Sequence, residues 1–291
     1  MELLHGIGRA LAHARPSLIL LAIALHLVGL VVTGERWRGV IAALGGRVTL
    51  LRSTLINLAG IFVRNATPTT GLGGDASRIA LLRAEGVGLP QATASFVYVR
   101  VAELPAIAVI VLLSLPVVGG AITRSTRGVE LALGAAVIAI VLLWAMRHRV
   151  AAQLTSLRNR TAHVRIPVSA FAIAAGYAAA AQLETLVRQI VVAAAFGFPL
   201  TPQQSATVTA FSIVGGFAPT VGSIGAIEGS MVAALMLCGA PAETAVAIAL
   251  AERAISYGIS TGLGAGALAA LGGRAILRFA TDRHSDAVTA G

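Results

Sequence analysis

Long apolar runs fill most of this sequence, and they limit its possible folds more than any other feature. A helix needs about 20 mostly apolar residues to cross the hydrocarbon core of a bilayer. Membrane spans are expected at residues 16–33, 48–64, 90–119, 130–146, 166–196 and 242–271. The stretch 204–238 is also apolar but is interrupted. The sequence therefore predicts an all-α, polytopic transmembrane helical bundle, with residues 1–291 in a single integral membrane domain.

The charge content supports this prediction and excludes several kinds of chemistry. Charged residues make up 12% of the chain, whereas soluble domains carry about a quarter. The net charge of +10 comes from arginine alone, because the sequence contains no lysine. Without lysine the chain cannot build a Walker A loop, a Schiff base or a Ser-Lys dyad. The arginines are scattered among apolar spans, which argues against nucleic-acid binding and suits cytoplasmic loops and anionic lipid headgroups.

The sequence predicts no catalytic residues, no metal site and no cofactor. Cys238 is the only cysteine, and the histidines form no cluster with the spacing of metal ligands. His26 lies in the first apolar run and is expected to be a neutral, hydrogen-bonded packing residue. The segment Gly258–Gly262 matches the G-x-S-x-G nucleophile motif, but it lies inside a spanning run. Together with Gly266, these glycines are expected to form a close-packing helix face.

The distribution of arginine predicts the orientation in the plasma (inner) membrane. The segment 147–165 carries the largest arginine cluster, so it is expected in the cytoplasm together with both termini. The apolar run from Pro16 to Val32 has no convincing cleavage site after it and is expected to stay as an uncleaved first span. The side of the membrane on which residues 34–47 lie stays open.

Two segments rich in proline and glycine interrupt the apolar pattern at matching places. The first is Pro68–Asp75 and the second is Pro219–Glu228. Proline and clustered glycine break helices, and the freed backbone groups survive in a membrane only inside protein or beside a wet cavity. Matched breaks in two halves of a chain are typical of inverted-repeat transporters. We therefore expect two re-entrant segments, in repeat 1 (48–119) and repeat 2 (204–271); ordinary loops are the alternative.

Each broken segment ends in a carboxylate, and an arginine follows 25 residues later: Arg100 after Asp75, and Arg253 after Glu228. An arginine in a spanning helix costs about 2.5–3.5 kcal/mol on insertion scales, so it marks a candidate functional residue. Its planar guanidinium suits a phosphodiester. The alternative is a structural ion pair: Glu103 lies on the same helical face as Arg100, and Asp75 and Glu228 are further possible partners.

These segments resemble the membrane region of lysyl-phosphatidylglycerol synthase/flippase proteins and the stand-alone flippase-like proteins of that superfamily. The resemblance rests on Asn65–Pro68, Gly73–Asp75 with Arg100, and Ala218–Glu228 with Arg253, and it covers roughly residues 10–280. It implies lipid translocation, or binding of a polar headgroup, between two re-entrant segments. Bifunctional members carry an aminoacyl-transferase domain after this region. Because this sequence ends shortly after Arg278, synthesis is not implied.

The leading hypothesis is a membrane protein that binds and translocates a lipid with a phosphate-bearing headgroup, either an anionic phospholipid or a prenyl-phosphate type. The candidate substrate-binding residues, expected around one polar cavity, are Arg100, Arg253, Asp75, Glu228, Asn65, Gly73, Gly74, Gly222 and Gly225. One alternative is an accessory subunit that presents a lipid-linked substrate to a separate transferase, and a weaker one is a membrane-embedded transferase. A homo-oligomer is a further possibility.

Several other polar residues within the spans allow more than one interpretation. Glu184 and Arg188 have the i,i+4 spacing of a helical ion pair, for which a structural role is expected. Asn57, Asn65 and Gln182 could line a polar path or form interhelical hydrogen bonds.

Overall fold

The computed structural model of the 291-residue chain describes residues 6–8, 12–67, 72–124, 168–216, 218 and 221–272. The expected span 130–146 and the arginine cluster 147–165 lie outside these residues, as do Pro68 and Pro219 at the two breaks. The described part of the chain is built of helices and contains no strand, in agreement with the predicted all-α bundle.

The described helices fall into two runs, which are separated by residues 125–167, outside the described part of the chain. Their bounds are α2 Pro16–Ala43, α3 Leu50–Ala66, α4 Leu72–Ala84, α5 Leu89–Arg124, α7 Val168–Ala195, α8 Pro202–Gly215, η1 Val221–Ser223, α9 Ala226–Leu237, α10 Ala242–Arg253, η2 Ala254–Ile259 and α11 Ser260–Ala270. Among them α2, α5 and α7 are long and apolar enough to cross a membrane. The π-helical turn η2 joins α10 to α11 without an interruption, so 242–270 is one long helix.

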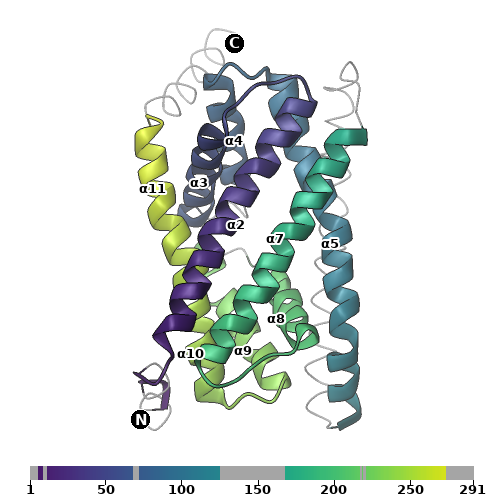
Figure 1. The fold of residues 1–291 in the computed structure, drawn as a ribbon, viewed down its shortest axis with the longest axis vertical. Helices are drawn as coiled ribbons and strands as arrows, with labels where there is room; N and C mark the ends of the chain where they lie inside the picture. Colours follow the sequence, from purple (N-terminus) through teal and green to yellow (C-terminus); the bar gives the residue numbers. More distant parts are fainter. Residues whose placement is uncertain are drawn as a thin grey trace, which may run out of the picture.

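The short helices form two pairs, one in each half of the chain. The helix α3 packs against α4, and α8 packs against α9. In Figure 1 the α3–α4 pair occupies the upper half of the bundle and the α8–α9 pair the lower half. The helix α5 runs downward in this view, whereas the helix from α10 to α11 runs upward.

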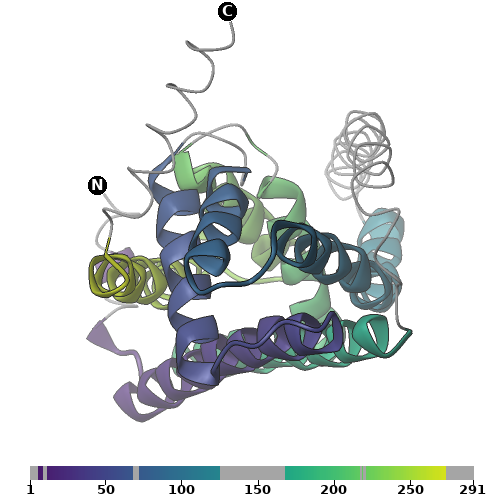
Figure 2. The same cartoon turned by 90° about the horizontal axis from the view of Figure 1, so that it is seen from above.

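The long helices enclose these pairs. The helices α2 and α7 lie side by side along one face of the bundle, and α11 and α5 lie on opposite sides of it (Figure 2). On these two sides α11 packs against α3, and α5 packs against α8. Each short pair is therefore held between the long helices.

Local sequence signals explain where the short helices begin. Thr49 caps α3 by accepting a hydrogen bond from the backbone N–H of Arg52. At the start of α8, Thr201 and Gln204 form a reciprocal capping box, and Pro202 occupies the first helical position. These residues satisfy backbone donors that have no partner within the helix.

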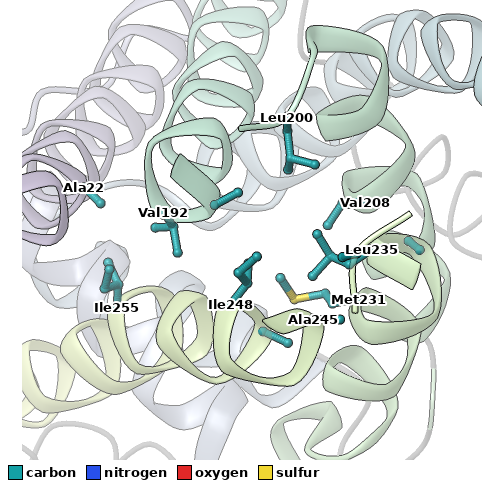
Figure 3. Close-up of a cluster of buried hydrophobic side chains, with 13 residues drawn as sticks. Ala22, Val192, Leu200, Val208, Met231, Leu235, Ala245, Ile248 and Ile255 are labelled. Carbon is teal, nitrogen blue, oxygen red and sulfur yellow. The ribbon is translucent and has the colours of Figure 1, made fainter. Parts of the chain in front are cut away.

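An apolar core joins the lower half of the bundle. Figure 3 shows Val192, Val208, Leu235 and Ile248 pointing toward one another from α7, α8, α9 and α10. Ala22 of α2 completes this cluster. This buried apolar cluster accounts for the packing of four consecutive helices on one another and on the distant helix α2.

The outer surface of the long helices is apolar, as expected for contact with lipid. Leu20 and Leu112 are 66% and 63% exposed, whereas Arg188 and Glu252 are buried. A soluble protein has the reverse distribution, with its charges outside. The structure therefore agrees with the predicted membrane environment.

The first long helix differs from the span expected at 16–33, because α2 continues to Ala43. Gly34 does not end the helix. It permits a close approach of α3, where the Ser53 hydroxyl donates a hydrogen bond of 2.7 Å to the Gly34 carbonyl. As a result, Arg36 and Trp37 are buried in the bundle and do not lie in a loop.

The glycine contact in α11 also differs from the expected one. A Cβ atom added to Gly258, Gly262 or Gly266 would meet no described atom within 4 Å. A Cβ at Gly264 would instead collide with the Leu58 carbonyl of α3. Within the described part of the chain, the expected Gly258–Gly262–Gly266 packing face is therefore not seen, because α3 lies against a different side of the helix.

This difference gives a direct test of the α3–α11 contact. Gly264→Ala should destabilise the protein by about 1–3 kcal/mol, because the methyl group overpacks a backbone contact. Gly262→Ala in the same helix is the matched control; it should be neutral or stabilising by up to about 1 kcal/mol, through helix propensity. Thermal unfolding of the detergent-solubilised protein measures both. Equal melting temperatures for the two variants would contradict the packing described here.

Candidate functional site

The 25-residue spacing in the first half corresponds to an ion pair between α4 and α5. The Arg100 Nη2 atom donates to both oxygens of Asp75, at 3.2 and 3.1 Å. Asp75 also accepts a 2.7 Å hydrogen bond from Arg78, one turn further along α4. Asp75 is therefore a buried carboxylate shared by two arginines.

The same spacing in the second half joins α9 to α10. The Arg253 Nε atom donates to Glu228 Oε1 at 2.6 Å. The other oxygen of Glu228 accepts the Gly225 backbone N–H at 2.7 Å, and Arg253 Nη2 donates to the Gly222 carbonyl at 3.2 Å. Gly222 and Gly225 both have positive φ, which glycine adopts without strain. This pair thus stabilises the glycine-rich break before α9.

The first half contacts the second through Asn65 at the end of α3. Its side-chain amide donates to the Thr261 hydroxyl at 2.8 Å, and its backbone carbonyl accepts a 3.3 Å hydrogen bond from Tyr257. The Tyr257 ring in turn lies 4.6 Å from the Arg253 guanidinium. Asn65 therefore belongs to an interhelical contact, one of the two roles expected for the polar residues of the spans.

The remaining two candidate residues lie in the first turn of α4. Gly73 and Gly74 immediately precede Asp75. A Cβ on Gly74 would collide with the Gly60 carbonyl and with the Arg64 side chain. Gly74 therefore permits α4 to pack closely on α3, and this packing positions Asp75.

A polar cavity of about 220 Å³ lies between α2, α3, α4, α5 and α7. The described residues that line it are Thr33, Arg36, Trp37, Asn57, Ile61, Arg64, Arg78, Val99, Arg100, Glu103, Ala178, Ala181, Gln182 and Thr185. Of the candidate binding residues, Arg100 lines this cavity, whereas Arg253 and Glu228 do not. The structure thus brings the predicted residues together in two pairs, of which one borders the cavity.

Positive charge is in excess around the cavity. Arg36 donates to Glu103 at 2.6 Å, and Arg100 lies 3.5 Å from the same carboxylate. Four arginines line the cavity, while two carboxylates, Glu103 and the adjacent Asp75, contact them. The described groups therefore carry two more positive than negative charges.

Arg64 has the fewest described contacts among these arginines. In the described part of the chain its guanidinium has no ion-pair or hydrogen-bond partner, although it is in electrostatic range of Asp75, Glu103 and Arg253. Arg100 is 42% exposed and also keeps free donor capacity. These two guanidinium groups can reach a ligand without the loss of a described contact.

Further donors around the cavity lack acceptors. The Nε atoms of Arg36 and Arg78 and the side-chain amide nitrogen of Asn57 are buried and have no partner among the described residues. All three are N–H donors, and buried donors are normally satisfied. A ligand with several acceptor oxygens and negative charge fits this set of donors better than a cation does.

Arg36, Arg64 and Arg78 line the cavity but are not among the binding residues predicted from the sequence. Hydropathy places Arg36 and Arg78 between spans, although α2 and the α3–α4 pair bury both side chains. One local signal was present for Arg78, because Asp75 lies three residues earlier and therefore on the same helical face. Arg64 had no such signal, since its position depends on how α3 meets α4 and α5.

A family model described as the lysylphosphatidylglycerol synthase TM region matches residues 3–264. The chain belongs to this family. The match agrees with the resemblance inferred from the Pro-Gly segments and with the apolar exterior of the helices. No curated protein and no solved structure matches the chain. The protein is therefore a membrane protein of the lysylphosphatidylglycerol synthase TM family.

The Glu228–Arg253 pair can be tested by a double-mutant cycle. Glu228→Gln and Arg253→Gln should each destabilise the protein by about 1–3 kcal/mol, because each leaves a charged partner poorly satisfied. The double variant should be less unstable than the sum of the two, which gives a coupling energy of about 1–3 kcal/mol. Thermal unfolding in detergent measures each corner of the cycle.

The matched control is the exposed ion pair between Arg52 and Glu85, whose charged atoms lie 3.5 Å apart. The same cycle of glutamine substitutions should give a coupling energy below about 1 kcal/mol there, because solvent screens the pair. Equal coupling energies at the two sites would show that Glu228 and Arg253 form no stronger a structural pair than an exposed one.

Proposed function

We propose that this protein binds a lipid with a phosphate-bearing headgroup and moves it between the leaflets of the membrane. The observation that carries the proposal is the donor-rich cavity among the long helices, in which Arg64 has no described partner. An unpaired arginine inside a membrane protein is expensive, and such residues mark substrate pathways.

The chemistry of the cavity suits a phosphodiester or a phosphomonoester. Guanidinium groups bind phosphate through two parallel, charge-assisted hydrogen bonds. The excess of two positive charges would be compensated in full by a doubly ionised phosphomonoester and by half by a phosphodiester. The description of the family names a synthase whose product is a phospholipid, and a phosphate site fits this class of ligand.

The size of the cavity favours the headgroup over the whole lipid. Its volume of about 220 Å³ is below the range of roughly 300–1,000 Å³ that is typical of pockets for drug-sized ligands. The headgroup would occupy the cavity while the acyl or prenyl chains remain in the hydrocarbon of the bilayer. The apolar outer surfaces of α2, α5 and α7 are compatible with such an arrangement.

Movement between leaflets requires access from both sides, and we propose an inverted repeat as its basis. Repeat 1 would contain the α3–α4 pair with α5, and repeat 2 the α8–α9 pair with the helix from α10 to α11. The matched carboxylate–arginine pairs and the opposite directions of α5 and α11 support this assignment. The two short pairs would act as re-entrant segments that enter from opposite sides.

Arg64→Gln tests the headgroup site. The substitution should weaken binding of an anionic phospholipid about 10- to 100-fold, because a charge-assisted hydrogen bond contributes about 1.5–3 kcal/mol. Binding of a fluorescent phospholipid to the purified protein measures this change. The rate at which the same lipid changes leaflet in proteoliposomes should fall in parallel.

Arg52→Gln is the matched control, because it removes the same charge from the same helix at an exposed position outside the cavity. It should leave both lipid binding and leaflet exchange unchanged. If neither reconstituted wild type nor control accelerates exchange across a panel of phospholipids and prenyl phosphates, translocation is refuted. Retained binding in that experiment would favour the role of an accessory subunit that presents a lipid-linked substrate.

A further inference from the structure

A second charged cluster lies away from the cavity, where α7 meets α10. Arg188 donates to Glu184 at 2.7 Å along α7, the i,i+4 pair expected from the sequence. Arg188 also donates to Glu252 of α10 through a short hydrogen bond. The side chains of Arg188 and Glu252 are only 5% and 4% exposed. One buried arginine is therefore shared by two carboxylates.

One oxygen of Glu252 has no partner. Its Oε1 atom accepts from Arg188, whereas its Oε2 atom is buried and makes no hydrogen bond with the described residues. The neighbouring residue Arg253 points elsewhere, toward Glu228. A buried ionised carboxylate normally has each oxygen satisfied by donors, and this one does not.

The charges around Glu252 leave one negative charge uncompensated. Glu184 and Arg188 face it from α7, while Arg253, paired with Glu228 of α9, lies beside it in electrostatic range. From α2, His26 interacts electrostatically with Arg188. These groups comprise two arginines and three carboxylates.

The remaining titratable groups nearby do not supply the missing positive charge. The His26 Nε2 atom lies 2.8 Å from the Ser260 hydroxyl in a buried contact, as expected for a packing histidine. Tyr257 of η2 stacks on Arg253. Arg64 interacts electrostatically with Arg253, but it borders the cavity and its charge belongs to that site.

We propose that Glu252 is a proton-binding site, which holds one exchangeable proton on Oε2 while Oε1 stays hydrogen-bonded to Arg188. Proton uptake converts the carboxylate into a neutral carboxylic acid, which leaves Arg188 balanced by Glu184 alone. Release returns the proton to water and restores the negative charge. A proton requires no ligand cage, and the described residues contain no group of three or more His, Cys, Asp or Glu that could hold a metal ion.

The helix that carries Glu252 has a feature suited to a change of state. The π-helical turn η2 begins at Ala254, two residues after Glu252. Such turns interrupt the regular α-helical hydrogen bonds and are frequent at functional sites. A shift of this turn would move Glu252 relative to Arg188, and the proton affinity of the carboxyl group depends on that contact.

The proton would serve as the coupling ion for lipid movement, a step that rests on the proposed function. The cavity and the proton site share α7, since Gln182 and Thr185 line the cavity and Glu184 and Arg188 form the cluster. A displacement of α7 upon headgroup binding would therefore reach Glu252.

Infrared spectroscopy tests the proton site independently of transport. Wild-type protein in lipid nanodiscs at neutral pH should give the C=O stretching band of a protonated carboxyl group, shifted in D₂O. The band should be lost in Glu252→Gln and retained in Glu243→Gln, a control from the first turn of the same helix. Glutamine keeps a carbonyl oxygen for Arg188, so the variant is expected to fold.

Three results would overturn the proposal. They are the absence of the band in wild type at neutral pH, its persistence in Glu252→Gln, and its presence only when sodium is removed, which would assign the site to a cation. Titration of the band in wild type to high pH should abolish it as the proton leaves. This measurement needs no variant, so the test does not depend on the folding of Glu252→Gln.

Proteoliposomes test the coupling step. An imposed pH gradient should change the rate of phospholipid exchange for wild type and for Glu243→Gln, but not for Glu252→Gln. Exchange that is insensitive to the gradient in wild type would refute coupling and leave the proton site intact. Absence of exchange in every sample would refute the proposed function, while the infrared result would still decide the proton site.

Discussion

The cost of placing charge in an apolar bundle is the constraint on which this structure depends. Lipid gives helices little hydrophobic reason to associate, so packing and polar contacts determine which of them meet. Here ion pairs join helices that are distant in the sequence: Arg36 with Glu103, and Arg188 with Glu252. The first links α2 to α5 and the second links α7 to α10. These pairs make one arrangement of the bundle much more favourable than others of similar apolar contact.

The pairs also divide the buried charge into two regions of opposite sign. Around the cavity arginine is in excess, while around Arg188 the carboxylates are in excess. If the buried charges were fully balanced, neither region would attract a charged ligand. The charge imbalance therefore distinguishes candidate binding sites from structural ion pairs. The presence of an ion pair does not by itself make this distinction. The helix α7 contributes to both regions and places them on one rigid element.

The sequence was sufficient for the membrane class, for the two matched carboxylate–arginine spacings and for His26 as a packing residue. It was insufficient for the cavity. Hydropathy indicates whether a segment enters lipid, but which face of a helix is buried depends on the neighbouring helices. Arg36 was therefore expected between two spans, whereas it lies in α2 and its side chain is buried in the bundle. The glycines of α11 illustrate the same limit. The regular spacing of the glycines predicted a helix contact at Gly262, whereas α3 packs against Gly264.

Arg253, Arg78 and Arg100 are held in ion pairs, whereas Arg64 has no described partner. Glu228 satisfies both Arg253 and the backbone at the glycine-rich break, so a ligand that took Arg253 would also expose the Gly225 N–H. Asp75 is likewise shared by Arg78 and Arg100. A headgroup that displaced one of these carboxylates would leave that carboxylate buried without its partner, which is strongly unfavourable. Binding at Arg64 displaces no described partner. Initial capture of an anion is therefore expected at Arg64, and the free donors of Arg100 would contact the bound phosphate as a second step.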